Sequence, residues 1–188
     1  MSDPGADPAT PLTVRDADPA GDAPACAEIY APYVSDSAIS FEERAPSAAE
    51  FRERIQRYGA THAWLVAECD GAVVGYAYAC AFNPRPVYRW SASVSVYVAA
   101  ERRGGGVGRA LYGELFERLR SRGFRMACAG ITLPNEASVA LHESFGFHPA
   151  GVLREIGWKR GDWHDVGWWQ LELSPAGHGA PAEPLPPG

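Results

Sequence analysis

The spacing of apolar residues along the chain predicts one mixed α/β domain. Apolar residues recur every three or four positions in four stretches, and this periodicity predicts helices over residues 23–34, 48–58, 107–122 and 136–145. Apolar or alternating runs predict strands over residues 12–15, 64–69, 73–81, 92–98, 125–131 and 166–173. Antiparallel hairpins come first and strand–helix pairs follow, an order that favours an α/β sheet with helices on both faces.

Cap and turn residues mark the ends of several of these elements. Ser47, with Glu50 three residues further on, fits a capping box at the start of the second helix. Asp22 is placed to cap the first helix. Asp70-Gly71 separates two apolar runs and is a hairpin turn signal, so we expect the two strands around it to pair.

A glycine-rich loop follows the most regular strand. Residues 92–98 alternate, so that valines share one face of the strand while serines and a tyrosine share the other. The loop RRGGGVG, residues 102–108, then leads into the third helix. Glycines let consecutive N–H groups turn inward, and the helix N-terminus adds the positive end of its dipole. The strand, loop and helix together predict an anion-binding site.

The spacing of these glycines separates the loop from other phosphate-binding motifs. A P-loop needs Gly-Lys-Ser/Thr before its helix, and here Val107, Gly108 and Arg109 stand instead. The Rossmann pattern GxGxxG fails as well, because its third glycine would fall at Arg109. The pattern that fits is Arg-x-x-Gly-x-Gly, formed by Arg103, Gly106 and Gly108. A flexible connector is the alternative interpretation.

Composition and charge narrow the classes of function. The chain has 188 residues, 46% of them apolar, which is enough for one core and too many for a disordered chain. Residues 1–11 and 174–188 are rich in Pro, Gly and Ala, which predicts disordered tails around one domain of residues 12–173. The net charge of −6, from 23 acidic and 17 basic residues, argues against general binding of nucleic acid or anionic membranes.

Cysteine spacing and the start of the chain indicate a reducing compartment. Cys26, Cys69, Cys80 and Cys128 lack the spacings of zinc or redox motifs, and we expect them as buried apolar side chains. The first residues lack a signal-peptide pattern, and no apolar run is long enough to cross a membrane. These patterns predict a cytoplasmic protein without a metal site.

Two segments resemble the GNAT superfamily of N-acetyltransferases. The glycine loop, with its strand and helix, is similar to the acetyl-CoA site of that superfamily. A second superfamily segment is matched within residues 133–147 by Asn135, Ser138, Leu141, His142, Gly146 and Phe147. The resemblance implies the GNAT fold, a central twisted sheet that is mixed but mostly antiparallel, flanked by helices on both faces. It also implies acetyl-CoA as the co-substrate.

Further strings resemble the phosphinothricin N-acetyltransferases within that superfamily. They are WLVAE at residues 64–68, NPRPVYRW at 83–90, LPN at 133–135 and GDWHDVG at 161–167. Such enzymes acetylate the α-amine of phosphinothricin or methionine sulfoximine and are commonly homodimers. The resemblance therefore implies a homodimeric acyltransferase for a small amino-acid-like amine, with a role in resistance to such compounds.

The resemblance also implies roles for single residues at the cofactor. The backbone N–H of Val98 is expected to hold the thioester carbonyl, and Asn135 to contact the pantetheine or a loop that holds it. The other expected cofactor contacts are Tyr97, Arg103, Gly104, Gly105, Gly106, Val107, Gly108, Arg109, Ser138 and His142. His142 stands where many relatives carry a tyrosine that protonates the leaving thiolate; a partly buried structural histidine is the alternative.

One residue departs from the family pattern. Relatives read Trp-Thr-x-Glu before the Val-Tyr-Val strand end, and that Glu is thought to be the general base; here Ser93 stands in its place. A serine hydroxyl is a poor base, although it can hold a water. Three interpretations stay open. His142 or a water chain takes the proton, Glu42 or Glu43 reaches the site, or the activity is lost.

The expected amine pocket has three candidate residues. Arg85 and Tyr88 lie in a segment that resembles the acid-binding loop of the family, where a guanidinium can grip a carboxylate or phosphinate with two hydrogen bonds. Phe41 is expected to line the same pocket. Arg85 as an ordinary surface residue is the alternative. For the whole chain, the alternatives are a GNAT enzyme for another amine and a non-catalytic or weakly active acyl-CoA-binding module.

Overall fold

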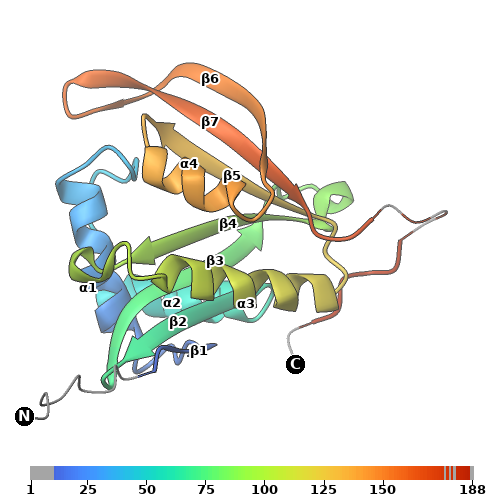
Figure 1. Cartoon of the computed structure of the whole chain (residues 1–188), viewed down its shortest axis with the longest axis horizontal. Helices are drawn as coiled ribbons and strands as arrows, with labels where there is room; N and C mark the ends of the chain where they lie inside the picture. Colours follow the sequence, from blue (N-terminus) through green and yellow to red (C-terminus); the bar gives the residue numbers. More distant parts are fainter. Residues whose placement is uncertain (1–10, 176, 178, 180, 187–188) are drawn as a thin grey trace, which may run out of the picture.

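The computed structural model describes residues 11–175, 177, 179 and 181–186. Its strands form one seven-stranded sheet in the order β1-β2-β3-β4-β5-β7-β6 (Figure 1). They are β1 (Thr13–Asp16), β2 (Ala63–Cys69), β3 (Ala72–Ala81), β4 (Ser91–Val98), β5 (Met126–Leu133), β6 (His148–Lys159) and β7 (Asp162–Glu172). The helices are α1 (Ala23–Ser35), α2 (Ala48–Gly59), α3 (Val107–Ser121) and α4 (Glu136–Glu143), and short 3-10 turns span Pro86–Tyr88 and Ala100–Arg102.

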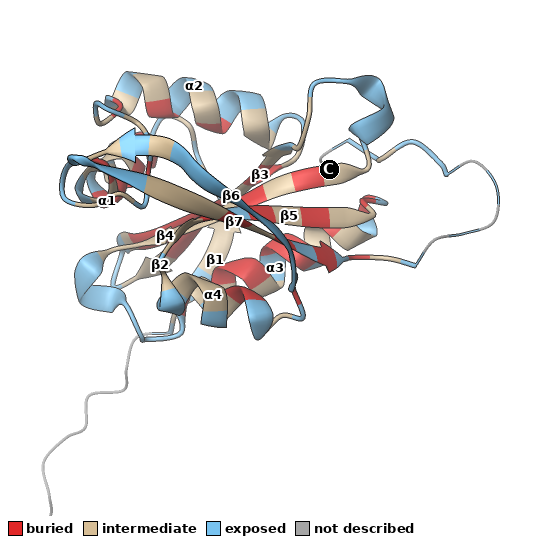
Figure 2. Cartoon of the chain, turned by 90° about the horizontal axis from the view of Figure 1, so that it is seen from above, coloured by how far each residue is buried: buried red, intermediate tan, exposed pale blue. Residues whose placement is uncertain are grey.

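The sheet has a hydrophobic core on each face. Helices α1 and α2 lie on one side of it and α3 and α4 on the other (Figure 2). On the α3 side, Leu111, Leu115 and Leu119 are fully buried, as the periodicity predicts, in the core that also contains the valines of β4. On the α1 side, aromatic side chains fill the core: Tyr30, Phe51, Trp64, Tyr76, Tyr78 and Tyr97. The predicted α/β fold class, with helices on both faces, is confirmed.

Most predicted element boundaries agree with the structure to within a few residues. The capping box is present, because Ser47 Oγ accepts from the N–H of Glu50 and the Glu50 carboxylate accepts from the N–H of Ser47. The hairpin turn at Asp70 and Gly71 joins β2 to β3, with both residues at positive φ. Asp22 stands at the N-cap position of α1 as predicted, but its side chain makes no capping hydrogen bond and its carboxylate pairs with Arg15 at 2.6 Å instead.

The sequence did not predict strand β6. The structure places His148–Lys159 as a long edge strand, paired with β7 in an antiparallel hairpin, and β7 begins earlier than the predicted strand at residue 166. This strand carries a proline, glycines and two register irregularities, and nearly all its residues are exposed. A strand exposed on both faces has no reason to alternate, so periodicity gave no signal.

Residues 181–186 lie against the end of the sheet where β4 begins. The Leu185 N–H donates to the Arg122 carbonyl, and the Arg122 side chain donates back to the Leu185 carbonyl, each at 2.8 Å. Nearby, the Trp90 indole N–H donates to the carbonyl of Ala182 at 2.7 Å. Composition alone did not indicate these contacts. The N-terminal tail, apart from residue 11, lies outside the described residues.

The cysteines differ in burial. Cys26 is buried, whereas Cys69, Cys80 and Cys128 are half-buried, so full burial holds for Cys26 alone among the four. Within the described residues, no His, Cys, Asp and Glu side chains form a group of three or more that could hold a metal ion. None of the described helices has the length and apolar character needed to cross a membrane.

Candidate active site

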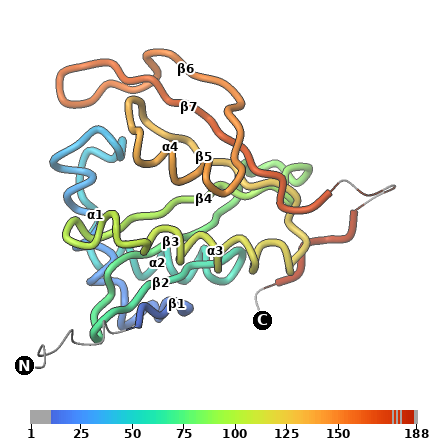
Figure 3. Tube along the Cα trace, in the orientation of Figure 1, coloured from blue at the N-terminus to red at the C-terminus, as the bar shows by residue number. Residues whose placement is uncertain are grey.

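Strands β4 and β5 begin as parallel neighbours and then separate. Their ladder pairs Ser91–Ser93 with Met126–Cys128 and stops there, although β4 runs on to Val98 and β5 to Leu133. The traces of the two strands diverge in Figure 3, and α4 lies beside the wider end. Parallel strands normally stay hydrogen-bonded along their shared length. A gap bordered by peptide groups therefore opens in the middle of the sheet.

A cavity of about 60 Å³ lies in this gap. Its lining comes from both separating strands, from α3 and the region of α4, and from the loop between α1 and α2: Ile39, Val94, Ser95, Val96, Tyr97, Tyr112, Ala129, Gly130, Ile131, Thr132, Asn135, Ser138 and His142. Four residues that the sequence singled out, Tyr97, Asn135, Ser138 and His142, thus meet in one place. Because residues from both faces of the sheet line the cavity, groups on the α1 side and on the α3 side face each other through the gap.

The peptide groups of β4 alternate between β3 and the gap. The N–H of Phe82 donates to the carbonyl of Ser91, and the N–H of Ala99 donates to that of Val74, so odd-numbered residues here bond to β3. Even-numbered residues therefore turn their N–H and C=O groups the other way. Val96 lies past the last pair of the β4–β5 ladder, and its peptide groups face the open gap.

Tyr33 of α1 occupies the peptide groups of Val98. The Val98 N–H donates to the Tyr33 hydroxyl at 3.2 Å, and that hydroxyl donates to the Val98 carbonyl at 2.6 Å. The role expected for Val98, holding a thioester carbonyl with its N–H, therefore does not fit this arrangement. The N–H of Val96 is the nearest peptide donor along β4 that the alternation directs into the gap.

The glycine loop turns from the end of β4 into α3. Gly104 and Gly106 have φ values of 77° and 82°, a region that L side chains rarely adopt, and Gly106 is the N-cap of α3 without a side-chain cap. The first N–H groups of this 15-residue helix are thus left to face an anion. A Cβ on Gly108 would lie 3.2 Å from the Leu141 side chain, so the loop also packs closely on α4.

Comparison with known proteins identifies the family. Residues 19–168 match the model of the acetyltransferase (GNAT) domain. The chain is 36% identical over 176 residues to a phosphinothricin N-acetyltransferase of Streptomyces viridochromogenes, covering 94% of this chain and 93% of that one. It is 34% identical over 174 residues to an L-methionine sulfoximine/L-methionine sulfone acetyltransferase of Salmonella typhimurium, covering 90% and 98%.

A solved structure agrees with these matches. A GNAT superfamily phosphinothricin acetyltransferase from Sinorhizobium meliloti, in complex with acetyl-CoA, superposes with a TM-score of 0.86 at 38% identity, covering 92% of this chain and 94% of that one. The chain belongs to the GNAT acetyltransferases. The predicted family, its fold and an acetyl-CoA-dependent N-acetyltransferase activity are confirmed.

In this GNAT domain, hydrogen bonds at both ring nitrogens orient His142, and burial favours its neutral form. Its Nδ1 lies 2.7 Å from the carbonyl oxygen of Ser138, which can only accept, so Nδ1 carries the hydrogen. Nε2 then bears a lone pair and accepts from the Tyr112 hydroxyl at 3.0 Å. Burial lowers the pKa of His142 because it disfavours the charged ring. In this state the ring can accept a proton at Nε2 but has none to donate there.

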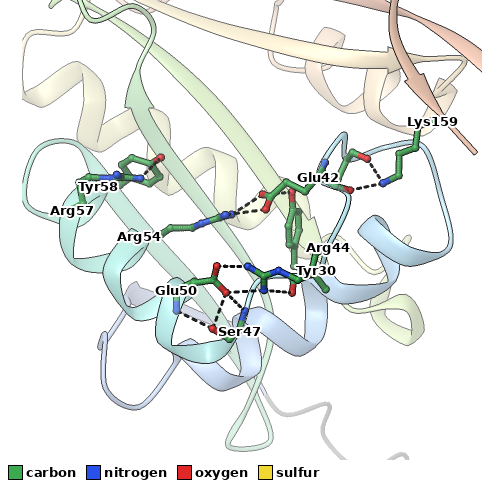
Figure 4. A network of polar contacts seen from close by, with 11 residues as sticks. Tyr30, Glu42, Arg44, Ser47, Glu50, Arg54, Arg57, Tyr58 and Lys159 are labelled. Carbon is green, nitrogen blue, oxygen red and sulfur yellow. Dashed lines mark hydrogen bonds and ion pairs between the residues drawn. The ribbon is translucent and has the colours of Figure 1, made fainter.

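Glu42, one of the two carboxylates proposed to replace the missing Glu, is already paired with a cation. Ser93 lies on the α1 side of β4 between Cys80 and Cys128, so no acid adjoins it on the neighbouring strands. Arg54 grips the carboxylate of Glu42 with two hydrogen bonds of 2.7 and 2.9 Å, and together with the Tyr30 hydroxyl it lowers the pKa of Glu42 (Figure 4). A carboxylate held this way is a weak base.

The three expected substrate residues fall into two places. Phe41 lies between α1 and α2, against the β6–β7 hairpin at His164, with ring centroids 6.2 Å apart. Arg85 and Tyr88 lie at the opposite end of β4, and Arg85 lines a separate cavity of about 440 Å³ there, beside residues 183–186. The structure therefore brings Phe41 to the side of the gap but does not place Arg85 there.

Sequence reasoning missed three residues that shape the site. Tyr33 and Tyr112 stand in regular helical patterns that predict only core positions, since a pattern does not show where a hydroxyl points. Lys159 lies in the unpredicted strand β6. The sequence offered one signal for the two tyrosines. A tyrosine at a predicted core position carries a hydroxyl that needs a hydrogen-bond partner when it is buried.

Proposed function

We propose that this protein acetylates the α-amine of phosphinothricin, methionine sulfoximine or a similar amino-acid-like compound, using acetyl-CoA. The observation that carries this proposal is the gap between β4 and β5, which holds a cavity reached by groups from both faces of the sheet and lies on the strand that ends at the glycine loop. The relatives named for these two substrates match nearly the whole domain and support this class of amine.

The proposed cofactor path follows the peptide groups already described. The pyrophosphate binds at the N–H groups from Arg103 to Arg109, where the α3 dipole and two arginines favour an anion. The pantetheine arm lies along β4 and exchanges hydrogen bonds with Val96, so it takes the place that β5 leaves empty. Asn135 and Ser138 border the arm from the start of α4, where Asn135 accepts from the Ser138 N–H at 3.2 Å.

The proposed chemical step moves one proton from nitrogen to sulfur. The neutral amine attacks the thioester carbon, a C–N bond forms, the C–S bond breaks, and coenzyme A leaves as the thiol. A free α-amine has a pKa of about 8, so a modest acceptor suffices near neutral pH. Nε2 of His142, through the Tyr112 hydroxyl, accepts the amine proton and returns it to the thiolate. Ser93 holds a water that links the amine to this pair.

Three wider features belong to the proposal. The protein works in the cytoplasm, it gives resistance to glutamate-like inhibitors, and it is a homodimer. Support for the dimer comes from β6, a 12-residue edge strand with exposed apolar side chains at Val152, Leu153, Ile156 and Trp158. A long exposed edge strand with apolar residues invites a partner, and two-fold symmetric pairs are the commonest assemblies.

A turnover assay with acetyl-CoA tests the proposal. Release of the coenzyme A thiol is followed with phosphinothricin, methionine sulfoximine, aspartate and spermidine as competing acceptors. The proposal expects kcat/KM for the first two to exceed that for the others by at least about tenfold. Preference for spermidine or aspartate would assign another amine. Tight binding of acetyl-CoA without turnover of any acceptor would leave a binding module.

A further inference from the structure

The ammonium of Lys159 is held by three carbonyl groups from another part of the chain. Lys159 Nζ donates to the carbonyls of Val34, Ser40 and Glu42 at 2.7, 2.6 and 2.9 Å. Figure 4 shows its side chain extending toward the stretch of chain around Glu42. An ammonium has three N–H donors, so each one has its own acceptor. The carbonyl of Val34 belongs to the last turn of α1, where the helix dipole also favours a cation.

Two of these carbonyls, those of Ser40 and Glu42, belong to one segment, residues 36–46, which we call the acceptor loop. Other contacts hold it from different directions. The Thr132 hydroxyl of β5 donates to the carbonyl of Ile39 at 3.2 Å, and Arg54 of α2 grips the Glu42 carboxylate. Ile39 also lines the cavity in the gap. The acceptor loop therefore borders the gap on the α1 side, and Lys159 ties it to the β6–β7 hairpin.

The acceptor loop brings Phe41 onto a glycine of the hairpin. A Cβ on Gly157 would lie 2.2 Å from Cε2 of Phe41, which is closer than any real contact, so the ring rests where only glycine leaves room. Gly157 is two residues from Lys159 on the same strand. Lys159 therefore positions the Phe41 ring by holding the acceptor loop, and Gly157 leaves the space that this ring occupies.

Charges around Lys159 come from its own strand and from the loop. Burial and the neighbouring Arg160 lower the pKa of Lys159, and Glu42 acts against them. Arg160 donates to the carbonyl of Ser35 at 2.7 Å and touches the same helix end without reaching the acceptor loop. It is therefore a matched control for a cation at this position.

We propose that Lys159 is a positioning residue that fixes the acceptor loop, and with it Phe41, as the wall that sets affinity for the amine. This inference rests on the proposed function, since it concerns the amine side of the same gap. It assigns to the hairpin a part in selecting the acceptor, while acetyl-CoA binds along β4 and the glycine loop.

The test compares Lys159→Met and Gly157→Ala with Arg160→Met as the control. The first variant removes the charge at similar length, and the second displaces Phe41 while leaving the ammonium in place. Steady-state KM is measured separately for the amine and for acetyl-CoA. Hydrogen exchange of residues 36–46 is measured in the free protein, where it needs no activity.

We expect both test variants to raise KM for the amine by about tenfold, equivalent to about 1.4 kcal/mol, with KM for acetyl-CoA changed less than about twofold. Lys159→Met should also speed exchange in the acceptor loop, and Arg160→Met should do neither. Unchanged exchange in Lys159→Met, or equal increases in the two KM values, would overturn the inference. If the parent acetylates no amine, the proposed function fails, and unchanged exchange alone then decides against the loop assignment.

Discussion

The hydroxyl of Tyr112 and the carbonyl of Ser138 meet the two nitrogens of His142 from opposite sides. Together they orient the ring so that Nε2 accepts a hydrogen bond. The family pattern, which places a proton donor at this position, does not reveal that orientation. Ring orientation depends on a helix–helix contact between α3 and α4 and on a carbonyl one turn away. Residue identity at a single position therefore did not show which ring nitrogen is left to accept a hydrogen bond.

The first prediction concerns Tyr112→Phe. The hydroxyl lies 3.0 Å from Nε2 of His142, and in the proposed mechanism it carries the proton between the amine and that nitrogen. Its removal should therefore lower kcat by about tenfold near neutral pH. In that mechanism the neutral ring is the acceptor, and burial holds the pKa of His142 below its ordinary value, so the kcat/KM profile of the parent should fall with pH only below that ordinary value. Tyr58→Phe is the control, and an unchanged kcat in Tyr112→Phe would refute the relay.

The second prediction concerns Ser93→Glu. Ser93 pairs with Cys80 and Cys128, whose side chains are small, and it shares their face of the sheet on the α1 side. A carboxylate there supplies a base next to the amine, and such bases contribute about 100- to 10,000-fold in other enzymes. In the proposed mechanism His142 already accepts the proton in the parent, so we expect kcat/KM to rise by about tenfold or more. Ser91→Glu, one pleat away on the same face, should not share the gain.

The sequence predicted those helices and strands that bury one face and expose the other. The alternation of β4 and the leucines of α3 correctly indicated which sides meet, and the glycine loop between them indicated an anion site. The gap itself was not predictable, because it depends on where two strands far apart in sequence stop pairing after Ser93 and Cys128. Strand β6 was missed for the opposite reason, since an exposed edge leaves no periodic trace.

The third prediction concerns the loop that joins β4 to α3. Gly106→Val places a branched side chain at a φ of 82°, which strains the backbone and turns the first N–H groups of α3 away from the pyrophosphate. We expect the Kd for acetyl-CoA, measured by calorimetry, to rise by at least about tenfold, since two or more charge-assisted hydrogen bonds are lost.

The control for this loop lies on the same helix. Gly113 has no atom within 4 Å of an added Cβ, and it stands inside α3. Gly113→Ala should leave the Kd unchanged and should stabilise the protein by about 0.5–1 kcal/mol, because alanine loses less entropy than glycine in a helix. Similar affinities in the Gly106 variant and the parent would mean that the loop does not bind the cofactor.

The whole molecule combines an acidic surface with one apolar edge. The net charge of −6 keeps copies of the chain apart in general, whereas the exposed side chains of β6 provide a local attraction. Five apolar side chains stand exposed on the β6–β7 hairpin: Val152, Leu153, Ile156, Trp158 and Trp163. The same hairpin carries Lys159 and Gly157. A second chain bound to the hairpin would therefore also restrict the motion of the residues that hold the acceptor loop.

The last prediction follows from that arrangement. Ile156 is 55% exposed on the edge strand, and Ile156→Glu places a charge in the middle of the proposed contact. Light scattering should give the parent twice the chain mass of 20.2 kDa and the variant a single chain mass. Val87→Glu, at a position 73% exposed on the turn before β4, should stay dimeric. A parent of single chain mass would refute the dimer, whereas a monomeric variant with a raised KM for the amine would tie dimer formation to the acceptor loop.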